Sequence, residues 1–241
     1  MSRTQWAAIT AVVLAVLFAG TATVIAAGRD DGPATARTPS ADSADAGFAR
    51  DMSVHHQQAV EMSFIVRDST DDEDVRRLAY DVANTQANQR GMLLGWLDLW
   101  GLPKVEAGQE PMTWMTRMPA DMDMDHGQMD HGGQSGQSGQ MDHGQADDQG
   151  QQAHDGSLMP GMATNAELDQ LRTARGKQAE ILYLQLMTDH HKGGVAMAQA
   201  CARMCVVGPE KDLAEGMVAA QRSELGLMAD LLKERGAKPR G

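Results

Sequence analysis

The sequence predicts an all-α protein, a four-helix bundle built from two copies of one helical hairpin with a long crossover between them. Three observations lead to this prediction. Apolar residues recur at steps of three and four, one pattern occurs twice at an offset of 135 residues, and no stretch shows the period of two that is typical of a strand. Two hairpins joined by one long connection give a bundle.

The N-terminal residues form a segment separate from the bundle. Arg3 precedes an uncharged apolar stretch at residues 6–27, and Arg29, Asp30 and Asp31 follow it. About 20 apolar residues can cross a bilayer, but Val24 and Ala26 also have the spacing that a signal peptidase accepts. Residues 1–28 are therefore either a membrane anchor or a cleaved signal peptide, and both place the rest outside the cytoplasm. We expect residues 29–45 to be a flexible spacer.

The first hairpin is predicted at residues 46–101. Its first helix has one inward face, formed by Phe48, Met52, His55, Ala59, Met62 and Val66. Acidic residues at 71–73 mark the turn and the start of the second helix. The inward residues of that helix are Leu78, Val82, Gln86, Gln89, Leu93, Trp96 and Trp100, and the helix stops at Gly101 and Pro103.

The second hairpin is predicted at residues 164–236, followed by a tail at 237–241. Thr164 and Glu167 have the spacing of a capping box. We expect Gly176 to bend the helix, which then runs through Val207 to a turn at 208–209. The offset that relates the hairpins also matches Leu78 with Leu213, Val82 with Met217, Gln86 with Gln221, Leu97 with Leu232 and Gly101 with Gly236.

The duplicated motif supplies the candidate metal ligands. Met52-x-x-His55-His56, followed by Met62, recurs as Met187-x-x-His190-His191, followed by Met197. The first histidine of each pair is predicted to point inward, and the second lies about 100° away at the flank. Imidazole and thioether together suit copper. The alternative is a packed core in which the histidines bond to polar neighbours and the methionines fill space.

Residues on the second helix of each hairpin should face these histidines. Counting outward from the turns places Gln86 level with His55 and Gln221 level with His190, with Glu224 one turn further. A glutamine opposite an inward histidine can fix the tautomer of the ring through a hydrogen bond, the usual role of a residue behind a metal ligand. The alternative is that these glutamines lie at the solvent edge of the bundle.

The two cysteines lie on one face of the third helix. Cys201 and Cys205 have i, i+4 spacing, and the matching positions of the first repeat are Val66 and Thr70. Outside the cytoplasm we expect a disulfide. Binding of a soft metal together with Met204 is the alternative.

The crossover, residues 102–163, has its own composition. There is no Lys or Arg between Arg117 and Arg172, and the phrase Met-Asp-His-Gly occurs three times. Such a chain buries too little apolar surface to offset its ordering entropy, so we expect it to be disordered until it binds a cation. A plain hydrophilic spacer is the alternative. The candidate ligands of the phrases are Met124, His126, Met129, His131, Met141 and His143.

Net charge and motif spacing exclude several classes of function. The formal charge is -12, which disfavours nucleic acid and favours cations as partners. A di-iron oxidase needs Glu-x-x-His on two helices, but the residues three positions after Glu61, Glu180 and Glu215 are Phe64, Tyr183 and Val218. We find no nucleophilic triad and no phosphate-binding glycine loop. The sequence thus offers no catalytic constellation.

These motifs make the sequence resemble a family known as domain of unknown function 305. The resemblance covers residues 46–236 and also includes Trp96-x3-Trp100-Gly101 and Met159-Pro-Gly-Met162. It implies a ferritin-like four-helix bundle, an extracytoplasmic location and, by analogy with CopM-like copper-binding members, copper handling. The first motif departs from the family pattern, because Gln57-Gln58 stands where a glycine usually follows the two histidines.

We therefore expect an extracytoplasmic protein that sequesters copper or hands it on, as Cu(I), Cu(II) or both. Silver is an alternative ion, and the sequence does not identify a protein that receives the metal. Two other classes stay open: a ferritin-like metal-dependent oxidoreductase, and a metal-free interaction module of the cell envelope.

Overall fold

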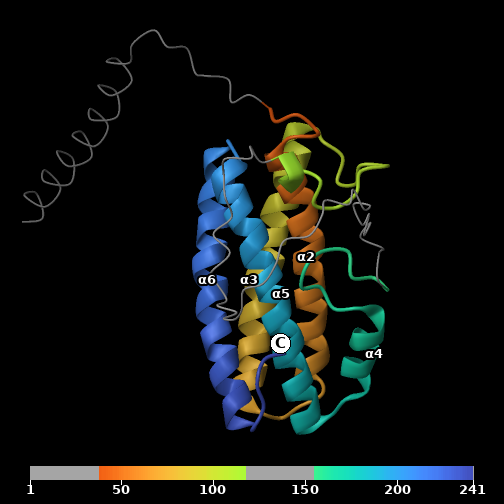
Figure 1. The fold of residues 1–241 in the computed structure, drawn as a ribbon, viewed down its shortest axis with the longest axis vertical. Coiled ribbons are helices and arrows are strands. Elements are labelled where there is room, and N and C mark those ends of the chain that lie inside the picture. Colours follow the sequence, from red (N-terminus) through yellow and green to blue (C-terminus); the bar gives the residue numbers. More distant parts are fainter. Residues whose placement is uncertain (1–37, 118–154, 241) are drawn as a thin grey trace, which may run out of the picture. The chain divides into compact units, whose positions relative to one another are not determined.

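The structure is a computed structural model that describes residues 38–117 and 155–240, and all statements below refer to these. They belong to the compact unit of residues 39–241. Four long helices form two hairpins: α2 (Ala44–Arg67) with α3 (Glu73–Trp100), and α5 (Gly176–Met204) with α6 (Gly208–Glu234) (Figure 1). A short helix α4 (Asn165–Thr173) packs against α2 and α5, and η1 (Met115–Arg117) is a 3-10 turn. The described residues contain no strand, so the predicted all-α bundle is confirmed.

The two hairpins meet through their first helices. α2 contacts α3 and α5 contacts α6 within each hairpin, and α2 packs along α5 between the hairpins (Figure 1). α2 and α5 run antiparallel along this contact (Figure 1), which we call the seam. Equivalent residues of the two repeats therefore meet near its middle. This arrangement brings the two histidine pairs together.

The helix ends mostly follow the sequence signals. The Asp72 side chain accepts a hydrogen bond from Val75 N at 3.0 Å and caps α3. Thr164 and Glu167 form the predicted capping box at the start of α4. Gly101 ends α3 in the left-handed region, at φ 66°, where glycine meets no Cβ penalty.

Three helix boundaries differ from the prediction. α2 begins at Ala44, so residues 44 and 45 are helical rather than part of the expected flexible spacer. The helix expected to bend at Gly176 is instead broken: α4 ends at Thr173, and Gly176 begins α5 with its N–H donating to the Ser69 carbonyl at 2.7 Å. The next helix ends at Met204 rather than at Val207. The Asp45 carboxylate accepts hydrogen bonds from the N–H groups of Val206 and Val207, which holds these residues out of helical pairing.

The apolar core consists of two clusters, one at each end of the bundle. The turn-end cluster, next to the 68–72 turn, is built from Ala59, Met62, Val66, Val75, Leu78, Ala79, Val82, Tyr183, Leu184, Leu186, Met187, Met228, Leu231 and Leu232, among others. The cystine-end cluster is built from Ala46, Phe48, Ala49, Met52, Leu93, Leu97, Trp114, Met159, Met162, Met197, Cys201, Cys205 and Met217, among others. On every long helix a polar segment separates the two clusters.

The expected disorder of the crossover does not extend to its two ends. After α3, Trp114 is buried against the edge of the Phe48 ring, and its indole N–H donates to Asp51 at 2.9 Å. Before α4, the Gln58 side chain bonds both backbone groups of Ala163, at 2.9 and 2.7 Å. Buried polar pairing and aromatic packing thus order residues 102–117 and 155–163.

The central part of the crossover, residues 118–154, lies outside the described residues. It includes all six candidate ligands of the Met-Asp-His-Gly phrases: Met124, His126, Met129, His131, Met141 and His143. The N-terminal segment, residues 1–37, also lies outside them. Within the described part of the chain, no helix has the length and apolar character needed to cross a membrane.

Candidate metal centre

A layer of polar side chains crosses the bundle between the two apolar clusters. We call it the histidine layer, and its members are His55, His56, Gln86, Gln89, His190, His191, Gln221 and Glu224. All four histidines are buried, with exposed fractions of at most 1%. The predicted inward position of His55 and His190 is confirmed, because α2 and α5 face each other at these residues.

His56 and His191, predicted at the flank of the inward stripe of each helix, are fully buried. About 100° around from the seam, α3 covers the side of α2 and α6 covers the side of α5. His56 Nε2 lies 2.9 Å from Gln89 Oε1 of α3, and His191 Nε2 lies 2.7 Å from Glu224 Oε2 of α6. Because Gln89 and Glu224 occupy equivalent positions of the repeat, the pairing itself is duplicated.

The inner histidines contact each other directly. The ring centroids of His55 and His190 are 3.7 Å apart, with an angle of 34° between the ring planes. His190 Nε2 lies 3.0 Å from the His55 carbonyl oxygen, which can only accept, so this nitrogen carries the proton. His55 itself makes no hydrogen bond through its ring, although the Pro160 carbonyl lies near enough to influence it.

The glutamines predicted to hold the inner histidines do not do so. Gln86 is buried, and neither its amide oxygen nor its nitrogen has a hydrogen-bond partner. Gln221 Oε1 is also without a partner and occupies the space beside Gly194, where a Cβ atom would come within 2.5 Å of it. Glu224 does contact a histidine, but that histidine is His191. The sequence argument placed Gln89 on the inward face but did not pair it with a histidine, which the repeat offset from Glu224 could have done.

The ring hydrogen bonds leave one nitrogen open in His56, His190 and His191, and both nitrogens open in His55. Nε2 of His56, His190 and His191 faces an oxygen acceptor, whereas Nδ1 of all four histidines is buried and unpartnered. In this tautomer Nδ1 carries the lone pair, the atom that a metal ion needs. A metal-bound histidine usually donates its other ring N–H to a carboxylate, a carbonyl or an amide in this way.

Three of the four histidines, His55, His56 and His190, are held in the neutral form that can bind a cation. Burial lowers the pKa of His55 and of His56 to about 3. Burial, followed by the neighbouring His55, also lowers the pKa of His190 well below its ordinary value. Protonation, which would block the lone pairs, is therefore suppressed in the folded chain.

Thioethers lie on both sides of the histidine layer. Met52 and Met197 belong to the cystine-end cluster, and Met62 and Met187 belong to the turn-end cluster; all four are completely buried. The end of the crossover adds two more thioethers to the cystine-end cluster, from Met159 and Met162. The sequence argument quoted Met159 and Met162 as part of a motif without giving them a role.

The crossover reaches the seam because α5 has a glycine there. The Pro160 carbonyl fits against Gly193 so closely that any Cβ at Gly193 would overlap it. In the first repeat the equivalent residue is Gln58, which instead anchors Ala163. The departure of the first motif from the family pattern therefore has a structural counterpart: one repeat receives the crossover and the other fastens it.

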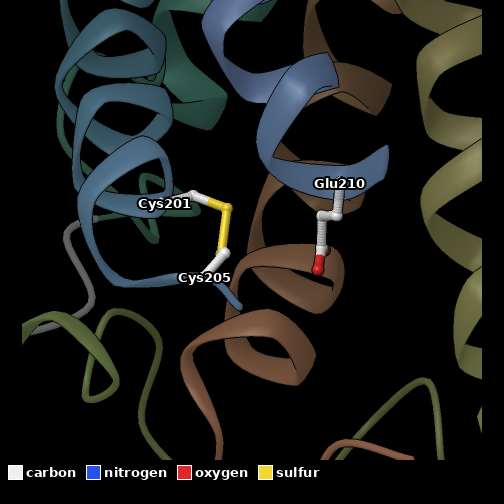
Figure 2. Close-up of side chains that lie close together, drawn as sticks. All are labelled: Cys201, Cys205 and Glu210. Atoms are coloured by element: carbon white, nitrogen blue, oxygen red, sulfur yellow. A yellow bond between two sulfur atoms is a disulfide. The ribbon is translucent and has the colours of Figure 1, made fainter. Parts of the chain in front are cut away.

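The arrangement limits how many imidazoles one ion can use. Among the described residues, three histidine, cysteine or carboxylate ligand atoms come within 4.8 Å of one another only at Cys201, Cys205 and Glu210. The histidine layer holds no such group of three, so an ion bound there would need other ligands, for which the buried thioethers are candidates. Cys201 and Cys205 are joined by the expected disulfide (Figure 2).

Comparisons with known proteins agree with the fold. A family model described as "Domain of unknown function (DUF305)" matches residues 45–232. No curated protein matches the sequence. The chain is similar to the crystal structure of a DUF305 protein from Streptomyces coelicolor that is expected to be secreted. The two are 57% identical, the match covers 84% of this chain and 99% of that one, and the TM-score is 0.65.

More distant structures share the fold alone. A DUF305 fragment from Deinococcus radiodurans is 24% identical, with 79% of this chain and 96% of that chain covered and a TM-score of 0.56. CopM in its Cu(I)-bound form is 16% identical, with 79% and 96% covered and a TM-score of 0.50. CopM in its Cu(II)-bound form is also 16% identical, with 80% and 97% covered and a TM-score of 0.50.

Proposed function

This chain belongs to the DUF305 family, and from its histidine layer we propose that it is an extracytoplasmic copper-binding protein that sequesters copper or hands it on. One observation carries the proposal. Four buried histidines, duplicated on two facing helices, each have an unpartnered Nδ1 atom in a layer bounded by methionine thioethers.

A purely structural role would not account for these open nitrogens. A buried polar atom without a hydrogen bond costs about 1–3 kcal/mol, and the layer contains Nδ1 of His55, His56, His190 and His191 in that condition. A cation bound to the nitrogens would offset this cost. The unpartnered amide of Gln86 lies in the same layer and adds to it.

The donor set favours copper over harder ions. Thioethers select Cu(I), and imidazoles bind copper in both oxidation states. The layer holds a single carboxylate, Glu224, which already pairs with His191, whereas a di-iron centre is built from several carboxylates. CopM, which has the same fold, has been crystallised with Cu(I) and with Cu(II). Silver shares the ligand preference of Cu(I) and is the natural competitor.

The proposed location rests on the N-terminal sequence. The apolar stretch at residues 6–27 has the length of a signal or an anchor, and the similar protein from Streptomyces coelicolor is expected to be secreted. A disulfide between Cys201 and Cys205 also fits an oxidising compartment.

Metal analysis of two matched variants of the full chain tests the proposal. Protein exposed to copper, iron and zinc together should retain copper after a competing chelator is applied. His55→Ala with His190→Ala should abolish the tightly held copper, with helix content checked by circular dichroism. The matched control replaces His126, His131 and His143 by Ala and should keep the tightly held copper. Equal retention in the wild type and the His55/His190 variant would refute the proposal.

A further inference from the structure

A second group of potential ligands lies at the far end of α5, away from the histidine layer. Cys201 is in the last turn of α5, Cys205 directly follows this helix, and Glu210 is in the first turn of α6 (Figure 2). The two sulfur atoms and a Glu210 carboxylate oxygen lie within 4.8 Å of one another, and all three residues are buried.

Glu210 is a buried carboxyl group whose side chain lies against the Asp45 carboxylate. It is completely buried, and neither of its oxygens makes a hydrogen bond of normal geometry. The nearby Asp45 carboxylate is occupied by the N–H groups of Val206 and Val207. Burial first, and then the charge of Asp45, raise the pKa of Glu210 to about 9, so the group is protonated at neutral pH. A bound cation would replace that proton and be coordinated by the Glu210 carboxylate oxygens.

The disulfide contributes little as a structural cross-link. Cys201 and Cys205 are four residues apart at the end of one helix, so the bond closes a very small ring and joins no two helices. The stabilisation that a disulfide gives by restraining the unfolded chain grows with loop length. Reduction of this disulfide should therefore cost the bundle little stability.

We propose that reduction of the Cys201–Cys205 disulfide opens a second metal site, in which the two thiolates and the Glu210 carboxylate bind a thiophilic cation of the Zn(II) or Cu(I) type. Thiolate and carboxylate are both ligands of Zn(II), and thiolate also suits Cu(I). Oxidation of the pair to the disulfide removes two of the three ligands and closes the site. The site shares no residue with the histidine layer and does not rest on the proposed function.

The chemistry balances with a dithiol as the reductant. The dithiol supplies two electrons and two protons, the bond between the two sulfurs breaks, Cys201 and Cys205 become thiols, and the dithiol becomes a disulfide. Metal binding then releases both thiol protons and the proton of Glu210. Cys205 has extended backbone angles, φ -67° and ψ 143°, so rotation of its side chain can separate the sulfurs without unwinding α5.

Cobalt(II) titration of the full chain tests the site, because thiolate ligands give cobalt a near-ultraviolet charge-transfer band that imidazole ligands do not. The chain is reduced with a phosphine, desalted without oxygen and titrated. We expect a band that saturates at one cobalt per chain and is displaced by zinc. The oxidised chain and the Cys201→Ser, Cys205→Ser variant should show no band.

The role of Glu210 has its own matched pair of variants. Glu210→Gln should weaken cobalt binding by about tenfold or more, since even changes behind a metal ligand cost that much. Glu215→Gln, at an exposed site one turn along α6, should leave it unchanged. If Glu210→Gln fails to fold, protection of the two cysteines from alkylation by zinc in the reduced wild type gives a second measurement. Absence of the band, equal affinity in a folded Glu210→Gln variant, or no protection by zinc would overturn the proposal.

Discussion

His55 and His190 stack in the centre of the bundle with their ring centroids 3.7 Å apart, although 135 residues separate them in the sequence. They are equivalent residues of the two repeats, so the contact joins the same position of both hairpins. Two neutral imidazoles can lie this close, but two imidazolium ions would repel each other without solvent to screen them. The contact therefore requires at least one of the two rings to stay unprotonated.

The stability of the metal-free chain should fall with acid. His55 and His56 have folded pKa values of about 3, against an ordinary value of 6.5. Between these values the unfolded chain binds protons that the folded chain excludes, so the free energy of unfolding should decrease as the pH drops from about 6.5 toward 3. Denaturant unfolding of the metal-free protein at a series of pH values measures this. A flat profile over that range would show that the histidines are not buried in solution.

Glu210 should make the free energy of unfolding decrease as the pH rises, the opposite direction to the effect of the histidines. Its pKa is raised from 4.5 to about 9, so the folded chain holds a proton that the unfolded chain releases between these values. The stability that Glu210 contributes is therefore complete below about 4.5 and is lost as the pH rises toward 9. Glu210→Gln should remove this alkaline decline and leave the acid limb unchanged. An identical alkaline slope in wild type and variant would contradict the prediction.

The carboxylate behind His191 should make the second repeat the stronger copper site. His191 pairs with Glu224, whereas His56 pairs with the neutral Gln89. A carboxylate partner increases the basicity of the ring, so Glu224→Gln should weaken the tightest copper site by roughly 10- to 100-fold. Gln89→Glu is the matched reverse change and should strengthen copper binding by the first repeat. Chelator competition measures both, and equal affinities in all three proteins would count against a role for these pairs.

The methionines should discriminate between oxidation states. Replacing Met52, Met62, Met187 and Met197 by Leu removes the thioethers but nearly keeps the volume. It should weaken Cu(I) binding and spare most Cu(II) binding, because thioethers bind Cu(II) poorly. Stability should change by less than about 1.5 kcal/mol per site. Separate titrations with each ion test this, and equal loss of both would show that the methionines act only through packing.

The addition of one methyl group at Gly193, where the crossover packs against α5, should destabilise the chain. Gly193→Ala would place a Cβ atom on the Pro160 carbonyl, and relief of the overlap should cost about 1–3 kcal/mol. Gly91→Ala, in the exposed middle of α3, meets no atom within 4 Å and should stabilise the chain by about 0.5–1 kcal/mol. Thermal unfolding compares the two. If both changes stabilise the protein, the 159–162 segment does not dock on α5 in solution.

Shortening the crossover should separate two kinds of copper binding. The replaced segment should stop before Asp155, because the Asp155 carbonyl accepts a 2.6 Å hydrogen bond from Asn165 N. Replacing only residues 118–154 by a short Gly/Ser linker should leave helix content and thermal unfolding nearly unchanged. It should remove several weakly bound copper ions and keep the tightest one, as calorimetric titration would show. Loss of the tightest site would mean that the Met-Asp-His-Gly phrases are primary ligands.

The features of the fold that the sequence predicted depend on residues close together in the chain or on the duplicated motif. The inward stripe from Phe48 to Val66 follows from helical periodicity, and the Thr164–Glu167 capping box follows from two residues three positions apart. The Cys201–Cys205 disulfide follows from spacing and compartment. Each of these rests on residues within a few turns of one another, where geometry is determined by the helix itself.

The unpredicted part depends on contacts between distant segments. A helical wheel places His56 at a flank, but α3 covers that flank and buries the ring. Trp114 is ordered by Asp51 and Phe48, more than sixty residues earlier, and nothing in its own neighbourhood signals this. Likewise, the Gly193 contact with Pro160 becomes visible only when the crossover is folded back onto α5.

The ordered ends of the crossover have a kinetic consequence. Trp114 fastens one end of residues 118–154 to the bundle, and the hydrogen bond between Asp155 and Asn165 fastens the other. The three Met-Asp-His-Gly phrases are thus tethered on both sides of their segment and cannot diffuse away from the histidine layer. In the proposed function, passage of an ion from a phrase to the layer would be a unimolecular event, governed by an effective concentration rather than by the amount of protein present. Its rate should be the same in dilute and in concentrated solution.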